Sequence, residues 1–126
     1  MITLAVIPAR GGSKRIPRKN LSLLAGHPLI HYTLSAAIKS KLIDRTIVST
    51  DDPDIAAIAS DYGIEVRVRP QHLSGDTSPT IDTVKDVVQE LSKQHFIPDS
   101  IILLQPTSPL RTHHHIDQAI QDFSDA

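Results

Sequence analysis

The sequence predicts an α/β fold in which a mostly parallel sheet of Rossmann-like type is flanked by helices. Short runs of aliphatic and β-branched residues alternate with longer stretches whose apolar residues recur at helical spacing. The first and last short runs, 2–7 and 100–104, are almost entirely apolar, as strands covered on both faces are. We therefore expect these two strands at the centre of the sheet. With 126 residues, 40% of them hydrophobic, the chain is long enough to bury one core, and residues 1–126 are expected to form one domain.

Strand and helix alternate four times along the expected fold. We predict strands at 2–7, 46–49, 65–68 and 100–104 and helices at 28–40, 53–62, 81–95 and 113–123. Pro28 and Pro53 suit the first turn of a helix, where no amide donor is required. Asp52 and Thr80 suit capping positions, and Gly63 suits the left-handed conformation that ends a helix.

The helix expected at 81–95 is amphipathic, so one of its faces should pack on the sheet. Its apolar face is expected to comprise Ile81, Val84, Val88 and Leu91. Its solvent-exposed face is expected to comprise Asp82, Lys85, Asp86, Gln89 and Glu90.

Composition excludes several classes of function. The chain has no cysteine, which removes disulfides and thiolate metal sites and fits a reducing compartment, the cytoplasm by default. The apolar run after Met1 is far shorter than the about 20 residues of a membrane span and has no basic leader, so no membrane association is expected. The net charge is −1, but five of the 13 Lys and Arg residues lie between Arg10 and Lys19. Because only 3% of residues are aromatic, a compact polyphosphate is a better partner than nucleic acid.

Two segments, 9–27 and 69–79, follow strand ends and are the candidate site, because ligands of open parallel sheets bind beyond the carboxyl ends of the strands. In the first segment, the adjacent glycines Gly11 and Gly12 let backbone amides approach an anion, and the surrounding cations supply charge for a triphosphate. The segment matches neither the Walker loop nor the dinucleotide fingerprint. On its residues alone, a flexible basic surface loop is the alternative.

Three groups of residues, spread over nearly the whole chain, match one known family in type and order. They are Ile7-Pro8-Ala9-Arg10-Gly11-Gly12-Ser13-Lys14 with Pro17, Lys19-Asn20 and Gly26; Val48-Ser49-Thr50-Asp51-Asp52 with Ile55-Ala56, Gly63, Glu65-Val66, Arg69-Pro70, Leu73 and Asp76-Thr77; and the run from Leu103 to Thr112. In these motifs the chain resembles the N-terminal portion of the acylneuraminate (CMP-sialic acid) cytidylyltransferases. The resemblance implies the fold of the nucleotide-diphospho-sugar transferases.

The resemblance also implies a binding site for CTP. Arg10 and Lys19 would be the catalytic cations that hold its phosphates. The other phosphate-side contacts would come from Ala9, Gly11, Gly12, Ser13 and Asn20. Arg69, Ser78 and Thr80 would read the cytosine, for which a strand-end arginine and a turn of small residues offer suitable donors and acceptors. The alternative for Arg69 is an ordinary surface arginine before a proline turn.

The same resemblance places Gln105, Ser108 and Arg111 against the incoming sugar. A neutral amide at the end of a buried strand can bond a polyhydroxylated ring without burying a second charge. Pro106 and Pro109 would also stop the strand, and the two interpretations are compatible.

Metal ligands are not identified by the residues themselves. Asp51 and Asp52 are hard carboxylates that suit magnesium, but Asp52 before Pro53 is better interpreted as a helix cap. The consecutive residues His113 to His115 would point about 100° apart on a helix and would not converge on one ion. Mg²⁺ is implied by the resemblance alone, with its ligands unknown.

The implied reaction is transfer of CMP from CTP to a sialic-acid-like 2-keto sugar acid, by in-line attack of the anomeric hydroxyl on the α-phosphorus and release of pyrophosphate. Pseudaminic acid, legionaminic acid and 3-deoxy-octulosonate are alternative acceptors. A non-catalytic nucleotide-binding fragment is the alternative from another class. Members of the family are nearly twice as long, so the resemblance implies an apparently truncated, catalytically incomplete chain whose full-length form is a homodimer.

Overall fold

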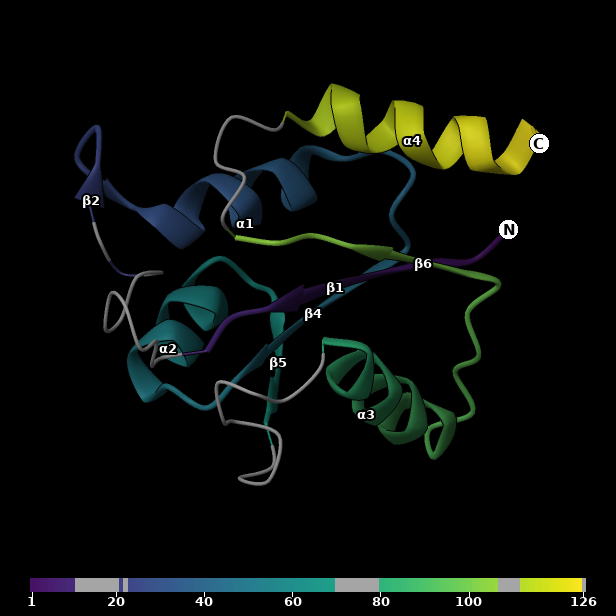
Figure 1. Cartoon of the computed structure of the whole chain (residues 1–126), viewed down its shortest axis with the longest axis horizontal. Coiled ribbons are helices and arrows are strands. Elements are labelled where there is room, and N and C mark those ends of the chain that lie inside the picture. The colour runs from purple at the N-terminus through teal and green to yellow at the C-terminus, as the bar shows by residue number, and fades with distance from the viewer. Residues whose placement is uncertain (11–20, 22, 70–79, 107–111, 126) are drawn as a thin grey trace.

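A four-stranded parallel sheet forms the framework of the protein (Figure 1). The computed structural model describes residues 1–10, 21, 23–69, 80–106 and 112–125. The strands are β1 (Thr3–Pro8), β2 (Leu23–Leu24), β3 (His27–Pro28), β4 (Arg45–Thr50), β5 (Glu65–Val68) and β6 (Ser100–Leu103). The helices are α1 (Leu29–Lys39), α2 (Pro53–Asp61), α3 (Thr80–Ser92) and α4 (His113–Asp125).

Strand β1 lies inside the sheet, whose order is β5-β4-β1-β6. It pairs with β4 on one side and β6 on the other, and β4 pairs with β5. All of these pairings are parallel, so the carboxyl ends of the four strands meet at one edge. The chain runs outward from β1 to β4 and β5 and then crosses back to β6 on the other side of β1. This reversal beside β1 is the position at which open α/β sheets bind their ligands.

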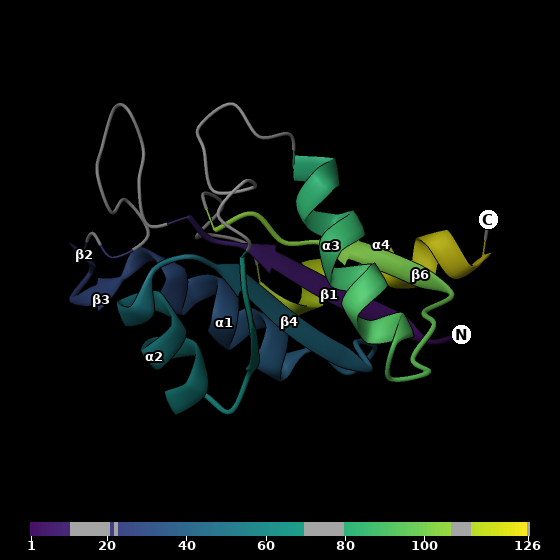
Figure 2. The same cartoon turned by 90° about the horizontal axis from the view of Figure 1, so that it is seen from below.

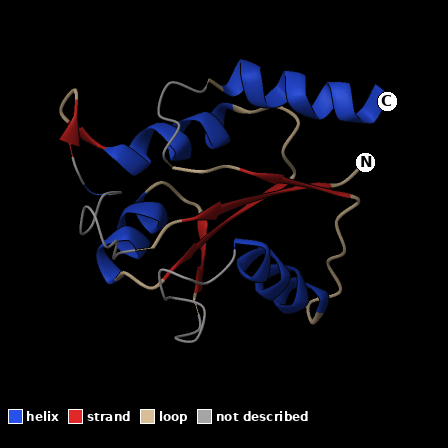
Figure 3. Cartoon of the chain, viewed as in Figure 1, coloured by secondary structure: helices blue, strands red, loops and turns tan. Residues whose placement is uncertain are grey.

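The two faces of the sheet are covered by different helices (Figures 2 and 3). Side chains alternate along β1, with Ala5 and Ile7 toward one face and Leu4 and Val6 toward the other. The face of Ala5 and Ile7 packs against α1, α2 and α4, and the face of Leu4 and Val6 packs against α3. Because all four side chains are 0% exposed, β1 is buried on both faces, as its apolar sequence predicted.

The eight predicted strands and helices are all present, with ends within three residues of the predicted ones. The structure adds a short antiparallel ribbon, β2 with β3, that the sequence pattern did not indicate. Its second strand leads directly into α1, where the ring of His27 stacks on that of His31 with centroids 4.2 Å apart. Pro28 therefore occupies the N-cap of α1 rather than its first turn.

The predicted start and end of α2 are confirmed. Asp52 is the N-cap, its carboxylate accepting a hydrogen bond from the backbone N–H of Asp54 at 2.8 Å. Pro53 occupies the first turn, and Gly63 has a φ of +77°, which favours glycine after a helix end. Thr80, in contrast, is the first residue of α3 and not its cap.

The prediction that the strand at 100–104 is central is wrong for the described sheet. Within the described residues, β6 pairs with β1 alone and forms an edge. On the face that α3 covers over β1, Ile101 and Leu103 of β6 remain 43% and 38% exposed. An apolar run does not distinguish an edge strand from a central one, because the position depends on pairing partners that are distant in sequence.

The predicted apolar face of α3 is correct only in part. Leu91 is buried and Val84 and Val88 pack against the core, but Ile81 is 56% exposed. The buried side of the helix includes Thr83 and Val87, so Ile81 lies at its margin in the first turn. Asp86, predicted to face solvent, has a side chain only 14% exposed, because it pairs with Arg67 of β5.

Asp117 attaches α4 to the turn that follows α1. Its carboxylate accepts hydrogen bonds from the backbone N–H of Lys41 at 3.0 Å and of Leu42 at 3.1 Å. The hydroxyl of Ser40 donates a third bond. Burial opposes ionisation of this carboxyl, but the hydrogen bonds outweigh it and hold the pKa of Asp117 below its ordinary value.

Replacing Asp117 with Asn should lower the free energy of unfolding at about pH 7 by about 1–3 kcal/mol, because an amide accepts these bonds less well than a carboxylate does. Since the folded-state pKa is depressed, the contribution exists above the ordinary value of 3.8 and is lost as the pH falls through the folded-state pKa. Urea denaturation of the wild type and the variant measures their free energies of unfolding. The difference between the two proteins should be clear at about pH 7 and smaller at about pH 3.

The control for this change is Asp122→Asn on the same helix, where the exposed carboxylate accepts a bond from the Gln118 side chain at 2.8 Å. We expect the control to change stability by less than about 0.5 kcal/mol. Equal losses in the two variants would refute the role given to Asp117.

Thr33 of α1 is 3% exposed, and its Oγ1 has no hydrogen-bond partner among the described residues. Thr33→Val keeps the shape and removes the hydroxyl, so it should raise the free energy of unfolding by about 1 kcal/mol. Thr33→Ser keeps the hydroxyl and removes a methyl group, and should lower it by about 1 kcal/mol. Thermal and urea denaturation of both variants measure the effect, and a less stable Val variant would mean that the hydroxyl is satisfied in solution.

Candidate functional site

The candidate site lies at the carboxyl edge of the sheet, where each strand is followed by a polar residue. Arg10 comes shortly after β1, Asp51 directly after β4, Arg69 directly after β5 and Gln105 shortly after β6. Because the four strands are parallel, these residues from distant parts of the sequence are brought to one edge. The edge thus carries Arg10 after β1, a carboxylate after β4, Arg69 after β5 and an amide after β6.

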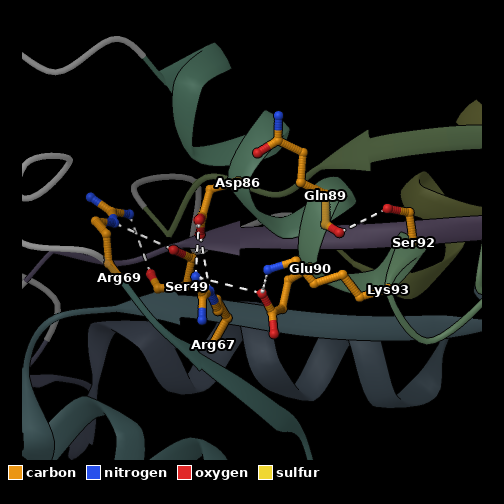
Figure 4. A network of polar contacts seen from close by, with 8 residues as sticks. All are labelled: Ser49, Arg67, Arg69, Asp86, Gln89, Glu90, Ser92 and Lys93. Carbon is orange, nitrogen blue, oxygen red and sulfur yellow. Dashed lines mark hydrogen bonds and ion pairs between the residues drawn. The ribbon is translucent and has the colours of Figure 1, made fainter.

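The end of β4 ties the neighbouring strand ends together through Ser49 (Figure 4). The Ser49 carbonyl accepts a hydrogen bond from the backbone N–H of Ala9 at 2.9 Å and another from Nη2 of Arg69 at 3.2 Å. Nε of Arg69 donates to the Ser49 hydroxyl at 3.4 Å, and the backbone N–H of Arg69 donates to the carbonyl of Thr50 at 2.8 Å. The backbone at Ala9 and the guanidinium of Arg69 are thus held by one residue.

Arg69 is a buried cation, only 5% exposed. The alternative that it is an ordinary surface arginine is therefore wrong, because its guanidinium lies inside the strand edge against Ser49. Burial is the largest effect on its pKa and lowers it, and the positive charge of Arg10 acts in the same direction, while Asp51 and Asp86 oppose the change. Two arginines are thus close enough to repel, which makes the edge favourable for an anion or another strong acceptor.

The chain that follows β6 stays close to β1 as far as Gln105. The backbone N–H of Leu104 donates to the carbonyl of Val6 at 2.9 Å, so β6 stays attached to β1 up to the residue before Gln105. Leu104 is buried, Gln105 is partly buried and Pro106 is buried. Strand β6 ends at Leu103, one residue before its predicted end, and Gln105 follows at the edge.

The acidic residues and histidines do not form a metal centre in the described part of the chain. Asp52 is used as the cap of α2, as predicted, while Asp51 is exposed. His113 to His115 occupy the first turn of α4, with the second and third exposed. No group of three His, Asp or Glu side chains gathers closely enough among the described residues to hold an ion.

The structure describes five of the predicted site residues: Ala9, Arg10, Arg69, Thr80 and Gln105. It brings the first three together at the ends of β1, β4 and β5. Thr80 begins α3, and Gln105 follows β6, which pairs with β1 on the side opposite β4. The others lie outside the described residues, namely Gly11, Gly12, Ser13, Lys19, Asn20, Ser78, Ser108 and Arg111.

Sequence reasoning missed two residues of this edge. Ser49 was matched only as part of a motif, although a serine near the end of an apolar strand is a signal for a buried polar contact. Asp86 was assigned to the solvent side of its helix, and only the position of Arg67 opposite it reveals the pair.

Nearly the whole chain matches known proteins. Residues 4–126 match the family described as cytidylyltransferase. The chain is 47% identical to a CMP-N,N'-diacetyllegionaminic acid synthase of Legionella pneumophila, over 96% of this chain and 53% of that protein. It is 39% identical to a pseudaminic acid cytidylyltransferase of Campylobacter jejuni, over 98% and 53%, and 37% identical to an N-acylneuraminate cytidylyltransferase of Escherichia coli, over 94% and 27%.

Solved structures show the same fold. A CMP:2-keto-3-deoxy-manno-octonic acid synthetase complexed with CTP superposes with a TM-score of 0.82 at 25% identity, covering 99% of this chain and 48% of that one. A 4-diphosphocytidyl-2C-methyl-D-erythritol synthase superposes with a TM-score of 0.75 at 14% identity, covering 99% and 55%.

The chain spans about half the length, or less, of the curated relatives described above. None of its described helices has the length and apolar content needed to cross a membrane. The match over residues 4–126, the identities to proteins that share the family name and the parallel sheet agree with the sequence resemblance, and the chain belongs to the cytidylyltransferase family.

Proposed function

We propose that residues 1–126 form the CTP-binding part of an enzyme that transfers CMP from CTP to a sialic-acid-like 2-keto sugar acid and releases pyrophosphate. The observation that carries this proposal is the buried Arg69 near Arg10, at the carboxyl edge of a parallel sheet, in a chain of this family. Cationic side chains at the ligand-binding edge of such a sheet favour a polyphosphate.

The chemistry requires positioning and charge neutralisation more than a covalent nucleophile. The anomeric hydroxyl oxygen of the sugar forms a bond to the α-phosphorus of CTP and gives up its proton to water, while the bond from that phosphorus to the bridging oxygen breaks and pyrophosphate leaves with the electron pair. Arg10, and by resemblance Lys19, would stabilise the phosphate charge. The backbone at Ala9, fixed to Ser49, would hold the start of the phosphate-binding segment in place.

Recognition of cytosine is assigned to Arg69 with Ser78 and Thr80. The guanidinium of Arg69 has a fixed orientation, because both Nε and Nη2 are bonded to Ser49. A donor of fixed direction suits the carbonyl and ring nitrogen acceptors of a pyrimidine edge.

The sugar acid would bind on the β6 side of the edge, at Gln105 with Ser108 and Arg111. Legionaminic acid is the second candidate acceptor, because the chain is 47% identical to a relative named for that sugar and 37% identical to one named for N-acylneuraminate. Pseudaminic acid and 3-deoxy-octulosonate are further acceptors to compare. A nucleotide-binding fragment without catalytic function is the alternative from another class.

Magnesium and a homodimeric full-length form are proposals that rest on the resemblance, and a cytoplasmic location is a proposal that rests on the lack of cysteine. The described residues do not form a magnesium site by themselves, because they contain no suitable cluster of acidic or histidine side chains and Asp52 is engaged as a cap. No step of the reaction is therefore assigned to the ion.

Arg10→Gln is expected to weaken CTP binding about tenfold or more, because it removes charge-assisted hydrogen bonds to phosphate. Titration calorimetry with CTP and Mg²⁺ gives the dissociation constants. The matched control is Lys39→Gln, which removes the same charge from an exposed residue at the end of α1, away from the carboxyl edge of the sheet. The control should bind CTP within about twofold of the wild type, and equal affinity in the Arg10 variant would count against the phosphate site.

Residues 1–126 alone are expected to bind CTP weakly and to form little or no CMP-sugar, since the chain spans 53% of its legionaminic acid synthase relative. Pyrophosphate release should be measured with CTP, Mg²⁺ and each of the four sugar acids in turn. Rapid release with any of them would contradict the expected incompleteness and would identify the acceptor. Failure of the wild type to bind CTP would contradict the proposed function itself.

A further inference from the structure

We propose that Asp86 is a positioning residue for nucleobase recognition, which acts through Arg67 to set the placement of Arg69 relative to Thr80. The inference rests on the proposed function, because it assumes that Arg69 and Thr80 bind the cytosine base. It concerns an ion pair that lies on the α3 face of the sheet rather than in the CTP site itself (Figure 4).

Asp86 and Arg67 form a two-pronged ion pair between α3 and β5. Nε of Arg67 donates to Oδ2 of Asp86 at 3.1 Å, and Nη2 donates to Oδ1 at 3.1 Å. The two side chains are 14% and 31% exposed, so the pair is partly shielded from solvent. Glu90, one turn further along α3, is 3.9 Å from Arg67 and also pairs with Lys93 at 3.4 Å. The bidentate geometry belongs to Asp86 and fixes direction as well as distance.

The ion pair lies close in the sequence to both of the residues proposed to bind the base. Arg67 precedes Arg69 by two residues on β5, and Asp86 follows Thr80 by six residues on α3. Because a strand and a helix are each stiff over such short distances, a bond between Arg67 and Asp86 fixes Thr80 with respect to Arg69.

The other described contacts of α3 with the sheet come from its buried side, which includes Thr83 in the first turn. The helix packs on the sheet through Val87 and Leu91, and apolar packing tolerates small rotations and shifts. Ile81, in the first turn, is exposed and does not anchor the helix. The ion pair adds a bidentate contact between α3 and β5, whose direction is fixed by two hydrogen bonds.

Asp86 also contributes charge at the site. Its carboxylate is one of the two that offset the loss of solvation of Arg69, and it therefore favours the charged guanidinium. The hydrogen bond from Arg67 to Asp86 is the main reason that the pKa of Arg67 is raised. Removing the carboxylate thus weakens the geometry and leaves a denser cluster of positive charge.

The test compares Asp86→Asn with Glu90→Gln, which removes the same charge one helical turn away. Titration calorimetry of the intact chain with CTP and with UTP, in Mg²⁺, measures both affinity and preference for cytosine. We expect Asp86→Asn to reduce the CTP:UTP preference about tenfold, because the base-reading geometry is loosened, while Glu90→Gln keeps the preference within about twofold of the wild type. Asp86→Glu, which restores a carboxylate, should recover part of the preference.

The outcomes separate this inference from the function on which it rests. A wild-type chain that binds no CTP overturns the proposed function. A wild type that binds CTP, with an Asp86→Asn variant of unchanged CTP:UTP preference, overturns the inference, even if the variant melts at a lower temperature. If Asp86→Asn does not fold, Arg67→Lys keeps the charge but loses the two-pronged geometry, and the same ratio decides in the same way.

Discussion

Parallel pairing of β1 with β4 on one side and β6 on the other is the constraint on which the rest of the structure depends. It brings the ends of four strands to one edge, and it places the reversal of chain direction beside β1. The apolar residues of β1 maintain this arrangement because they are buried against helices on both faces. The polar residues that follow the strands therefore lie at the same edge, although they are far apart in the sequence.

Hydrogen bonds between residues at the ends of the strands hold the carboxyl edge together. One carbonyl, that of Ser49, receives both the amide of Ala9 and the guanidinium of Arg69. Burial of that guanidinium would be unfavourable without acceptors, so Ser49 and the nearby carboxylates make the buried charge tolerable. The same arrangement keeps a guanidinium in a fixed place at the edge where parallel sheets bind their ligands.

Most of the strands and helices could be predicted, because they depend on local sequence patterns. Apolar periodicity located the eight main elements, and Asp52, Pro53 and Gly63 marked the limits of α2. The position of β6 at an edge and the pairing of Asp86 with Arg67 were not predictable, since each depends on a partner distant in sequence. The family motifs identified Arg69, but its burial against Ser49 became visible only when β5 was placed beside β4.

We propose that the carboxyl edge around β1 and β4 binds the triphosphate of CTP. Hydrogen exchange measured by mass spectrometry, with and without CTP and Mg²⁺, tests it most directly because it reports on the backbone along the whole chain. We expect slower exchange in residues 10–20 and around Arg69 when CTP is bound, with little change in α4. Unchanged exchange in residues 10–20 at millimolar CTP, or protection confined to other parts of the chain, would contradict it.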